Sequence, residues 1–134
     1  MSSFHLTIAT PEGGKFDGQA ERLTVRTTEG EVSILARHIN YVAALGMGPA
    51  TIVTEDGTER RAAAIGGVLA VTNGEVRLIV STFEWEDEID VERAKNALHR
   101  AEEALAKGDL NSEERALSEA ARRRALVRLG VMKK

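Results

Sequence analysis

Residues 84–98 read EWEDEIDVERAKNAL, and in this stretch the pattern of the chain changes from strand to helix. From Val91 onward, small apolar residues recur every three or four positions, which is the spacing of one face of an α-helix. Asp90 stands directly before them, where a carboxylate can accept from the free amides of a first helical turn. We therefore place a boundary near Glu88-Ile89-Asp90, between a region 1–88 and a region 89–134.

The region 89–134 is predicted to be a helical hairpin. Gly108 can end the first helix, and Asn111 with Glu114 has the spacing of a capping box that opens a second helix. The connection between the two is short, which predicts antiparallel neighbours. The apolar stripe is made mostly of alanine, which contributes only about 0.8 kcal/mol per buried methyl-sized group. We therefore expect a marginally stable, mobile tail.

The region 1–88 reads as short strands joined by turns. Phe4, Leu6 and Ile8 alternate with polar or small residues, as in a half-buried strand. Asp56-Gly57 and Asn73-Gly74 are favoured in two-residue hairpin turns, so we expect two tight hairpins. Strands at this spacing, with no helical period between them, predict an antiparallel β-sandwich or flattened barrel of about nine or ten strands. The expected fold class is α+β.

Composition excludes several classes of protein. The chain has 134 residues, 14.5 kDa and no cysteine, and its three histidines lie far apart, so we expect no metal site. No stretch approaches the roughly 20 apolar residues of a transmembrane helix, so no membrane insertion is expected and the chain should stay in the cytoplasm. Residues 1–90 carry 7 basic and 14 acidic side chains, whereas residues 91–134 carry 11 basic and 7 acidic ones.

The basic residues of the tail have two interpretations. Arg122-Arg123-Arg124 and Arg128 form either a solvated helical face or a surface for an acidic partner or a phosphate, which the guanidinium fork suits. Nucleic acid fits less well, because the chain is acidic overall and its aromatic residues lie outside this cluster. The acidic residues around Trp85 lack a neighbouring nucleophile, so we interpret that segment as a hinge and expect no catalytic residue.

Taken together, these motifs resemble the epsilon subunit of the bacterial F-type ATP synthase. The resemblance covers nearly the whole chain in the same order. The matching segments are Thr10-Pro11-Glu12-Gly13, Glu29-Gly30-Glu31 with Ile34-Leu35 and His38, Gly66-Gly67, Ile89-Asp90-Val91-Glu92-Arg93-Ala94, and Arg124-Ala125-Leu126-Val127-Arg128-Leu129.

The resemblance implies a non-catalytic rotor subunit at the cytoplasmic face of the cell membrane, which couples proton translocation to ATP synthesis. In such subunits the sandwich clamps the gamma subunit and rests on the c-ring. The hairpin either folds against the sandwich or extends along gamma toward the alpha and beta subunits and blocks ATP hydrolysis. The resemblance assigns Glu31 and His38 to gamma or the c-ring, and the basic cluster, including Arg122 and Arg123, to acidic segments of beta.

The resemblance also implies a regulatory ATP, with no required cofactor. The ATP-binding members of the family carry Ile or Leu, Asp, two variable residues, Arg and Ala, with further nucleotide contacts elsewhere. The matching residues here are Glu84, Ile89, Asp90, Arg93, Ala94, Arg100, Arg124 and Arg128. The alternative is that Asp90 is only a helix cap and Arg93 only a surface residue.

One loop departs from the family pattern. Ser33-Ile34-Leu35-Ala36-Arg37-His38 stands where the family usually has Gly-Ile-Leu-Pro-Gly-His, so we expect a less preorganised loop. An alternative function for the whole chain is a stand-alone ligand- or protein-binding β-sandwich with a helical tail. That alternative predicts no association with a gamma subunit.

Overall fold

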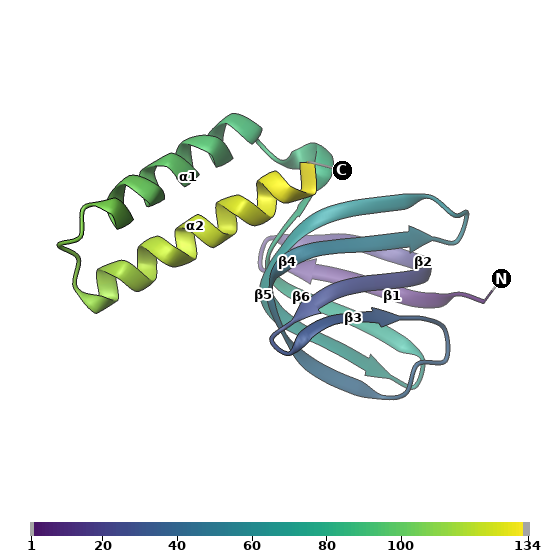
Figure 1. The fold of residues 1–134 in the computed structure, drawn as a ribbon. Helices are drawn as coiled ribbons and strands as arrows, with labels where there is room; N and C mark the ends of the chain where they lie inside the picture. The colour runs from purple at the N-terminus through teal and green to yellow at the C-terminus, as the bar shows by residue number, and fades with distance from the viewer. Residues whose placement is uncertain (1, 133–134) are drawn as a thin grey trace.

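The computed structural model describes residues 2–132 and confirms an α+β fold. In these residues a strand region is followed by a 3-10 turn and two α-helices (Figure 1). The elements are β1 (Phe4–Thr10), β2 (Gly13–Thr27), β3 (Gly30–Ile34), β4 (Tyr41–Thr54), β5 (Glu59–Thr72), β6 (Glu75–Trp85), η1 (Glu86–Glu88), α1 (Val91–Ala106) and α2 (Ser112–Met132). Neither helix of this part of the chain is long and apolar enough to cross a membrane.

The strands form one sheet that closes on itself. Their order is β1-β6-β5-β4-β2-β3, and a further β1–β2 pairing joins the two sides, so that β3 remains as an added edge. All pairings are antiparallel except β1–β6, which is parallel. The described residues hold six strands instead of the expected nine or ten. The difference arises because β2, β4 and β5 are 14 or 15 residues long and continue through irregularities that the sequence pattern suggested were strand ends.

The close approach of β5 to β6 requires glycine at position 67. Gly67 has a φ of 126°, and a Cβ built there would overlap the carbonyl oxygen of Ile79 and lie 2.8 Å from the Cα of Val80. Any other residue would force the two backbones apart. Both the β4–β5 and the β5–β6 pairings omit position 66, and Gly66 lines a groove that Arg123 of α2 also lines.

One of the two expected tight hairpins is confirmed and the other is longer. Asn73 and Gly74 have φ values of 50° and 86° and alone connect β5 to β6, as a type I′ turn requires. At Asp56-Gly57, by contrast, the four residues 55–58 separate β4 from β5, and the amide of Thr54 donates to the carbonyl of Thr58 across this turn. Asp56 Oδ1 accepts from Thr54 Oγ1 and from the Thr58 amide, and these bonds favour the wider turn.

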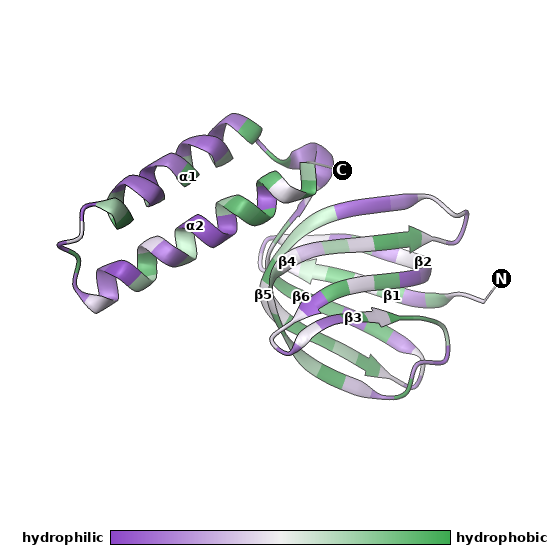
Figure 2. Ribbon diagram, viewed as in Figure 1, coloured by the Kyte–Doolittle hydropathy of each residue, from purple (hydrophilic) through white to green (hydrophobic). Residues whose placement is uncertain are grey.

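The sandwich core is aliphatic, with Trp85 at its helix-facing end. Leu6, Leu23 and Ile52 are fully buried, and green hydrophobic residues alternate with purple ones along the strands in Figure 2. The Trp85 indole is 7% exposed, makes an edge contact with Phe83, and lies 3.7 Å below the guanidinium of Arg60. Trp85 is therefore part of the sandwich.

A histidine bridges three strands on the outer surface. His5 Nε2 lies 2.6 Å from Asp17 Oδ1 on β2, and its Nδ1 lies 2.7 Å from Glu75 Oε1 on β6. Both ring nitrogens can donate to these carboxylates only when the imidazole is protonated. The hydrogen bonds, that of Asp17 first and that of Glu75 second, raise the pKa of His5 above its usual value.

The helix caps follow the sequence prediction. Asp90 Oδ1 accepts from the amide of Arg93 at the start of α1, and Gly108, with a φ of 77°, follows the end of that helix. Asn111 and Glu114 exchange side-chain to backbone hydrogen bonds of 3.0 and 2.8 Å, which confirms the capping box. The helices run antiparallel, and the C-terminal half of α2 lies against the end of the sandwich (Figure 1).

The contact between the hairpin and the sandwich includes a small apolar cluster. Its buried members are Ala63 of β5, Ile89 before α1, and Val131 of α2, with Val127 packed against them. We call these four residues the docking cluster. Its position fastens both the start of α1 and the end of α2 to the sandwich.

Candidate functional site

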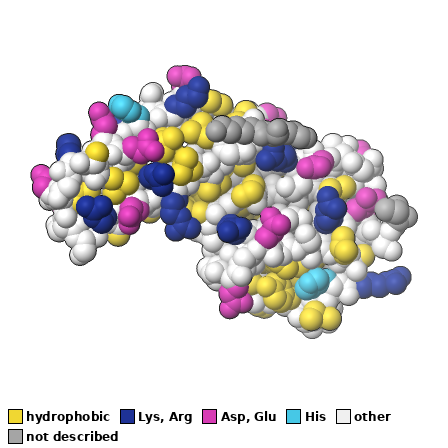
Figure 3. All heavy atoms as spheres, in the orientation of Figure 1, with side chains coloured by type: hydrophobic (Ala, Val, Ile, Leu, Met, Phe, Trp, Pro, Cys, Tyr) yellow, Lys and Arg dark blue, Asp and Glu magenta, His cyan; other side chains and the backbone are white. Residues whose placement is uncertain are grey.

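The hairpin and the sandwich enclose a cleft of about 510 Å³. α1 and α2 form two of its walls, and the segment from the end of β6 through η1 to Asp90 forms the third. In the space-filling view, basic side chains gather along the hairpin and its border with the sandwich (Figure 3). The cleft is lined by Glu84, Glu88, Asp90, Arg93, Ala94, Ala97, Arg100, Ala121, Arg124 and Arg128.

The structure thus brings together seven of the eight residues that the family resemblance assigns to ATP. The exception is Ile89, whose side chain is 8% exposed and packs in the docking cluster with Ala63 and Val131. Ile89 therefore has a packing role, because its aliphatic side chain fills the space between β5, the start of α1 and the end of α2. Ala94 is also buried, and its small side chain leaves room between the helices.

Arg128 and Glu84 connect α2 to the sandwich across the cleft. Arg128 Nε donates to Glu84 Oε1, and the two side chains are only 25% and 31% exposed. Partial burial strengthens such a charge-assisted hydrogen bond relative to one in open water. The pair therefore forms a polar attachment between the hairpin and β6, beside the apolar docking cluster.

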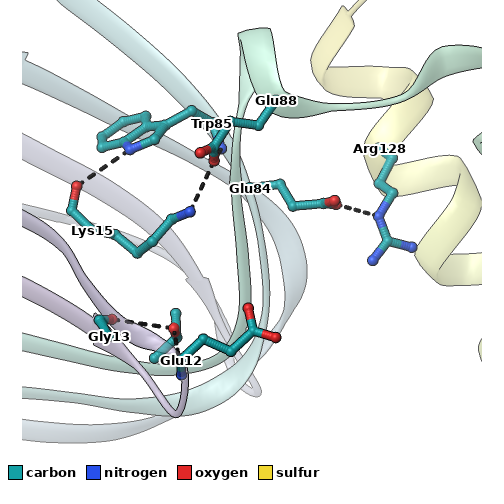
Figure 4. Close-up of polar contacts among 8 residues, drawn as sticks. Glu12, Gly13, Lys15, Glu84, Trp85, Glu88 and Arg128 are labelled. Atoms are coloured by element: carbon teal, nitrogen blue, oxygen red, sulfur yellow. Dashed lines mark hydrogen bonds and ion pairs between the residues drawn. The ribbon is translucent and has the colours of Figure 1, made fainter.

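The segment between β6 and α1 is held by Lys15, a residue that sequence reasoning did not select. Lys15 Nζ of β2 donates to Glu88 Oε1 at 2.9 Å, and the same oxygen accepts from the amide of Trp85 (Figure 4). These bonds, first that of Lys15 and second that of Trp85, hold the pKa of Glu88 below its usual value. Lys15 and Glu88 are separated by 73 positions, so no local pattern could have paired them.

The basic residues of α2 point in several directions. Arg124 and Arg128 line the cleft, whereas Arg122 pairs with Glu102 of α1 at 3.5 Å. Arg123 lines a different groove of about 470 Å³ between α2 and the sandwich, which Arg26 also lines. The run of arginines is therefore divided among three environments in this arrangement of the hairpin.

The residues assigned to gamma or the c-ring are not brought together. Glu31 lies near the start of β3, opposite Arg26 of β2, and is exposed. His38 lies in the loop after β3, where its Nδ1 donates to the carbonyl of Ile39 and its ring makes an edge contact with Tyr41. β3 therefore separates the two residues.

The loop that departs from the family pattern contains a strained residue. Arg37 has a φ of 68°, the left-handed region that favours glycine, and it occupies the position at which the resemblance expects glycine. The loop nevertheless keeps a turn, because the amide of His38 donates to the carbonyl of Leu35. The arginine is thus accommodated with the backbone shape that a glycine would adopt.

The fold and the cleft define a two-part α+β protein in which a helical hairpin covers an arginine-rich cleft at one end of a β-sandwich. A family model for the ATP synthase delta/epsilon chain β-sandwich domain matches residues 3–86. A second model, for the long α-helix domain of the same chain, matches residues 87–133. The chain therefore belongs to the ATP synthase delta/epsilon chain family. This membership confirms the family that the sequence motifs indicated.

Curated relatives agree with this assignment. The ATP synthase epsilon chain of Shouchella clausii is 37% identical over 133 residues, which cover 99% of this chain and 97% of the relative. That of Ruminococcus albus is 39% identical over 135 residues, with 100% and 99% covered. A chain of the Euglena gracilis mitochondrial ATP synthase, OSCP/F1/c-ring, has the same fold, with a TM-score of 0.84 at 24% identity over 97% of this chain and 81% of that one.

Proposed function

We propose that the chain is a non-catalytic central-stalk subunit of an F-type ATP synthase, coupling proton translocation to ATP synthesis, and that its hairpin is an ATP-sensitive brake on ATP hydrolysis. In the docked arrangement described above, ATP occupies the cleft. Without ATP, the hairpin leaves the sandwich, extends along gamma and hinders hydrolysis. The observation that carries this proposal is that the cleft takes its walls from both parts of the molecule.

The chemistry of the cleft suits a triphosphate. Among residues 2–132, Arg93, Arg100 and Arg124 line the cleft and form no ion pair. Guanidinium groups bind phosphate oxygens through two parallel hydrogen bonds, which makes arginine the preferred side chain for such ligands. Glu84 and Asp90 supply acceptors for an adenine amino group or a ribose hydroxyl.

The energetics allow a ligand to control docking. Full burial of one aliphatic side chain contributes about 1.5–3 kcal/mol. The docking cluster has two buried aliphatic side chains, a partly buried valine and a buried alanine. A ligand at about 100 times its Kd stabilises the state that binds it by about 2.7 kcal/mol. Loss of ATP therefore removes a contribution comparable to that of one buried aliphatic side chain, which is enough to shift a marginal equilibrium.

The outer surface of the sandwich supports a role as a binding subunit. Val42, Val68 and Ile79, on β4, β5 and β6, are 71%, 42% and 59% exposed, and Leu35 and Ile39 of the loop after β3 are exposed as well. Apolar residues gathered in this way are typical of a surface that a protein partner covers. We assign this surface and the loop containing His38 to gamma and the c-ring, at the cytoplasmic face of the cell membrane.

Titration of the isolated chain with ATP by calorimetry tests the proposal. ATP should bind saturably, ADP and GTP more weakly, and Arg93→Ala should weaken ATP binding. Arg115→Ala is the matched control, because Arg115 is an exposed arginine of α2 outside the cleft. Absence of ATP binding at millimolar concentration would contradict the ATP-sensing part of the proposal.

A second experiment tests the role in the complex. The chain should associate with the gamma subunit, and deletion of residues 91–134 should raise the ATP hydrolysis rate of the assembled complex. No association with gamma would favour a stand-alone binding protein. Hydrolysis of ATP by the isolated chain would contradict the assignment as a non-catalytic subunit.

A further inference from the structure

We propose that Lys15 is a positioning residue of the nucleotide cleft, which acts through Glu88 and does not touch the ligand. By pairing with Glu88, Lys15 neutralises a carboxylate at the rim of the cleft, and this neutralisation, not the hold of Lys15 on the segment before α1, is what lets the cleft accept a polyanion. This inference rests on the proposed function, because it concerns how the same cleft accepts a polyanion.

Lys15 holds the hinge at two points. Its Nζ donates to Glu88 Oε1 at 2.9 Å, and its carbonyl oxygen accepts from Trp85 Nε1 at 3.3 Å. Figure 4 shows the two contacts on the same side of the hinge, with Glu84 and Arg128 beside them. Trp85 is itself buried in the core, so η1 is anchored to the sandwich at both of its ends. If the hairpin leaves the sandwich, the backbone rotation that releases it therefore occurs after Glu88.

The carboxylates of the cleft each have a partner, and only Glu88 takes its partners from outside the cleft lining. Glu84 pairs with Arg128, and Asp90 accepts from the backbone amide of Arg93. Glu88 pairs with Lys15, which is absent from the cleft lining. Because Lys15 of β2 pairs with Glu88, the cleft arginines without an ion pair stay available for an anion.

Removal of Lys15 returns a negative charge to the rim. Glu88 has a side chain 45% exposed, so its carboxylate would stay ionised and would oppose a triphosphate in the same cleft. A like charge at this kind of partly exposed site, screened by physiological salt, should weaken binding about three- to tenfold. The weakening should decrease as the salt concentration rises.

Calorimetric titration of ATP into four full-length variants tests the inference. Lys15→Ala should weaken ATP binding about three- to tenfold relative to the wild type. Lys95→Ala is the matched control, since it removes one positive charge from an exposed site on α1 that pairs with Glu92, and it should bind like the wild type. Lys15→Arg should retain most of the affinity. In the Lys15→Ala background, Glu88→Gln should restore the affinity, because no charge is left to neutralise.

The outcomes separate this inference from the proposed function. If the wild-type chain fails to bind ATP, the proposed nucleotide cleft is wrong and the inference falls with it. If the wild type binds and Lys15→Ala binds equally well, only the inference is overturned. A double variant as weak as Lys15→Ala alone would also overturn it, because Lys15 would then act as a tether and not by neutralising Glu88.

Discussion

Truncation of Val131 to alanine should loosen the hairpin from the sandwich without unfolding either part. Val131 has no exposed surface, and it packs on Ala63 and Ile89 in the docking cluster. The substitution removes two methyl-sized groups, worth about 0.8 kcal/mol each, and leaves a small cavity. The expected loss of docking free energy is about 1.5–2.5 kcal/mol, which lowers the ratio of docked to released hairpin roughly 10- to 70-fold.

The absence of cysteine from the chain makes this ratio measurable. Cysteines can be introduced at Glu29, in the β2–β3 turn, and at Asp109, at the tip of the hairpin, and then spin-labelled. Pulsed electron paramagnetic resonance gives the distribution of distances between the two labels, which reports docking. Leu117→Ala is the matched control, because Leu117 lies on the same helix and is 68% exposed. If Val131→Ala and Leu117→Ala give the same distribution, the docking cluster does not hold the hairpin and the reasoning fails.

Three further substitutions test the sandwich, each by urea unfolding followed through Trp85 fluorescence. Gly67→Ala combines a forbidden φ with backbone overlap, so it should cost about 3 kcal/mol or more, and an unchanged midpoint would contradict the need for glycine there. Arg37→Gly should stabilise by up to about 1 kcal/mol, because relief of left-handed strain exceeds the entropy cost of glycine. His5 has a raised pKa, so its pairing with Asp17 and Glu75 stabilises the fold fully below the usual pKa of about 6.5 and is lost as the pH rises through the raised value. The wild-type midpoint should therefore fall over that pH range, whereas that of His5→Gln should not.

Much of the fold was predictable because it depends on neighbours in the sequence. Helix caps and tight turns join residues within three positions of one another, so residue type and spacing alone indicate them. Examples are the caps at Asp90 and Asn111 and the turn at Asn73-Gly74. Strand number was not predictable in this way. A strand that bends through an irregularity and a strand that ends there have the same local pattern, and only pairing with the neighbouring strands distinguishes them.

The candidate site was predictable as a set of residues but not as a mechanism. The family resemblance selected seven residues that line the cleft, yet it also selected Ile89, which packs in the docking cluster. An aliphatic side chain inside a ligand motif looks the same in the sequence whether it contacts a ligand or packs between two parts of the fold. Burial in the folded chain decides between the two.

The sequence by itself determined the two halves of this protein, their boundary, the helix caps and the excess of arginine in the tail, since each follows from periodicity, capping and charge over short stretches. Only the tertiary structure decided which charges meet. Arg128 reaches Glu84 across 44 positions, and Lys15 reaches Glu88 across 73. Ion pairs depend on distance in space, and that distance is set by how β2, β6 and α2 pack, which no local pattern encodes.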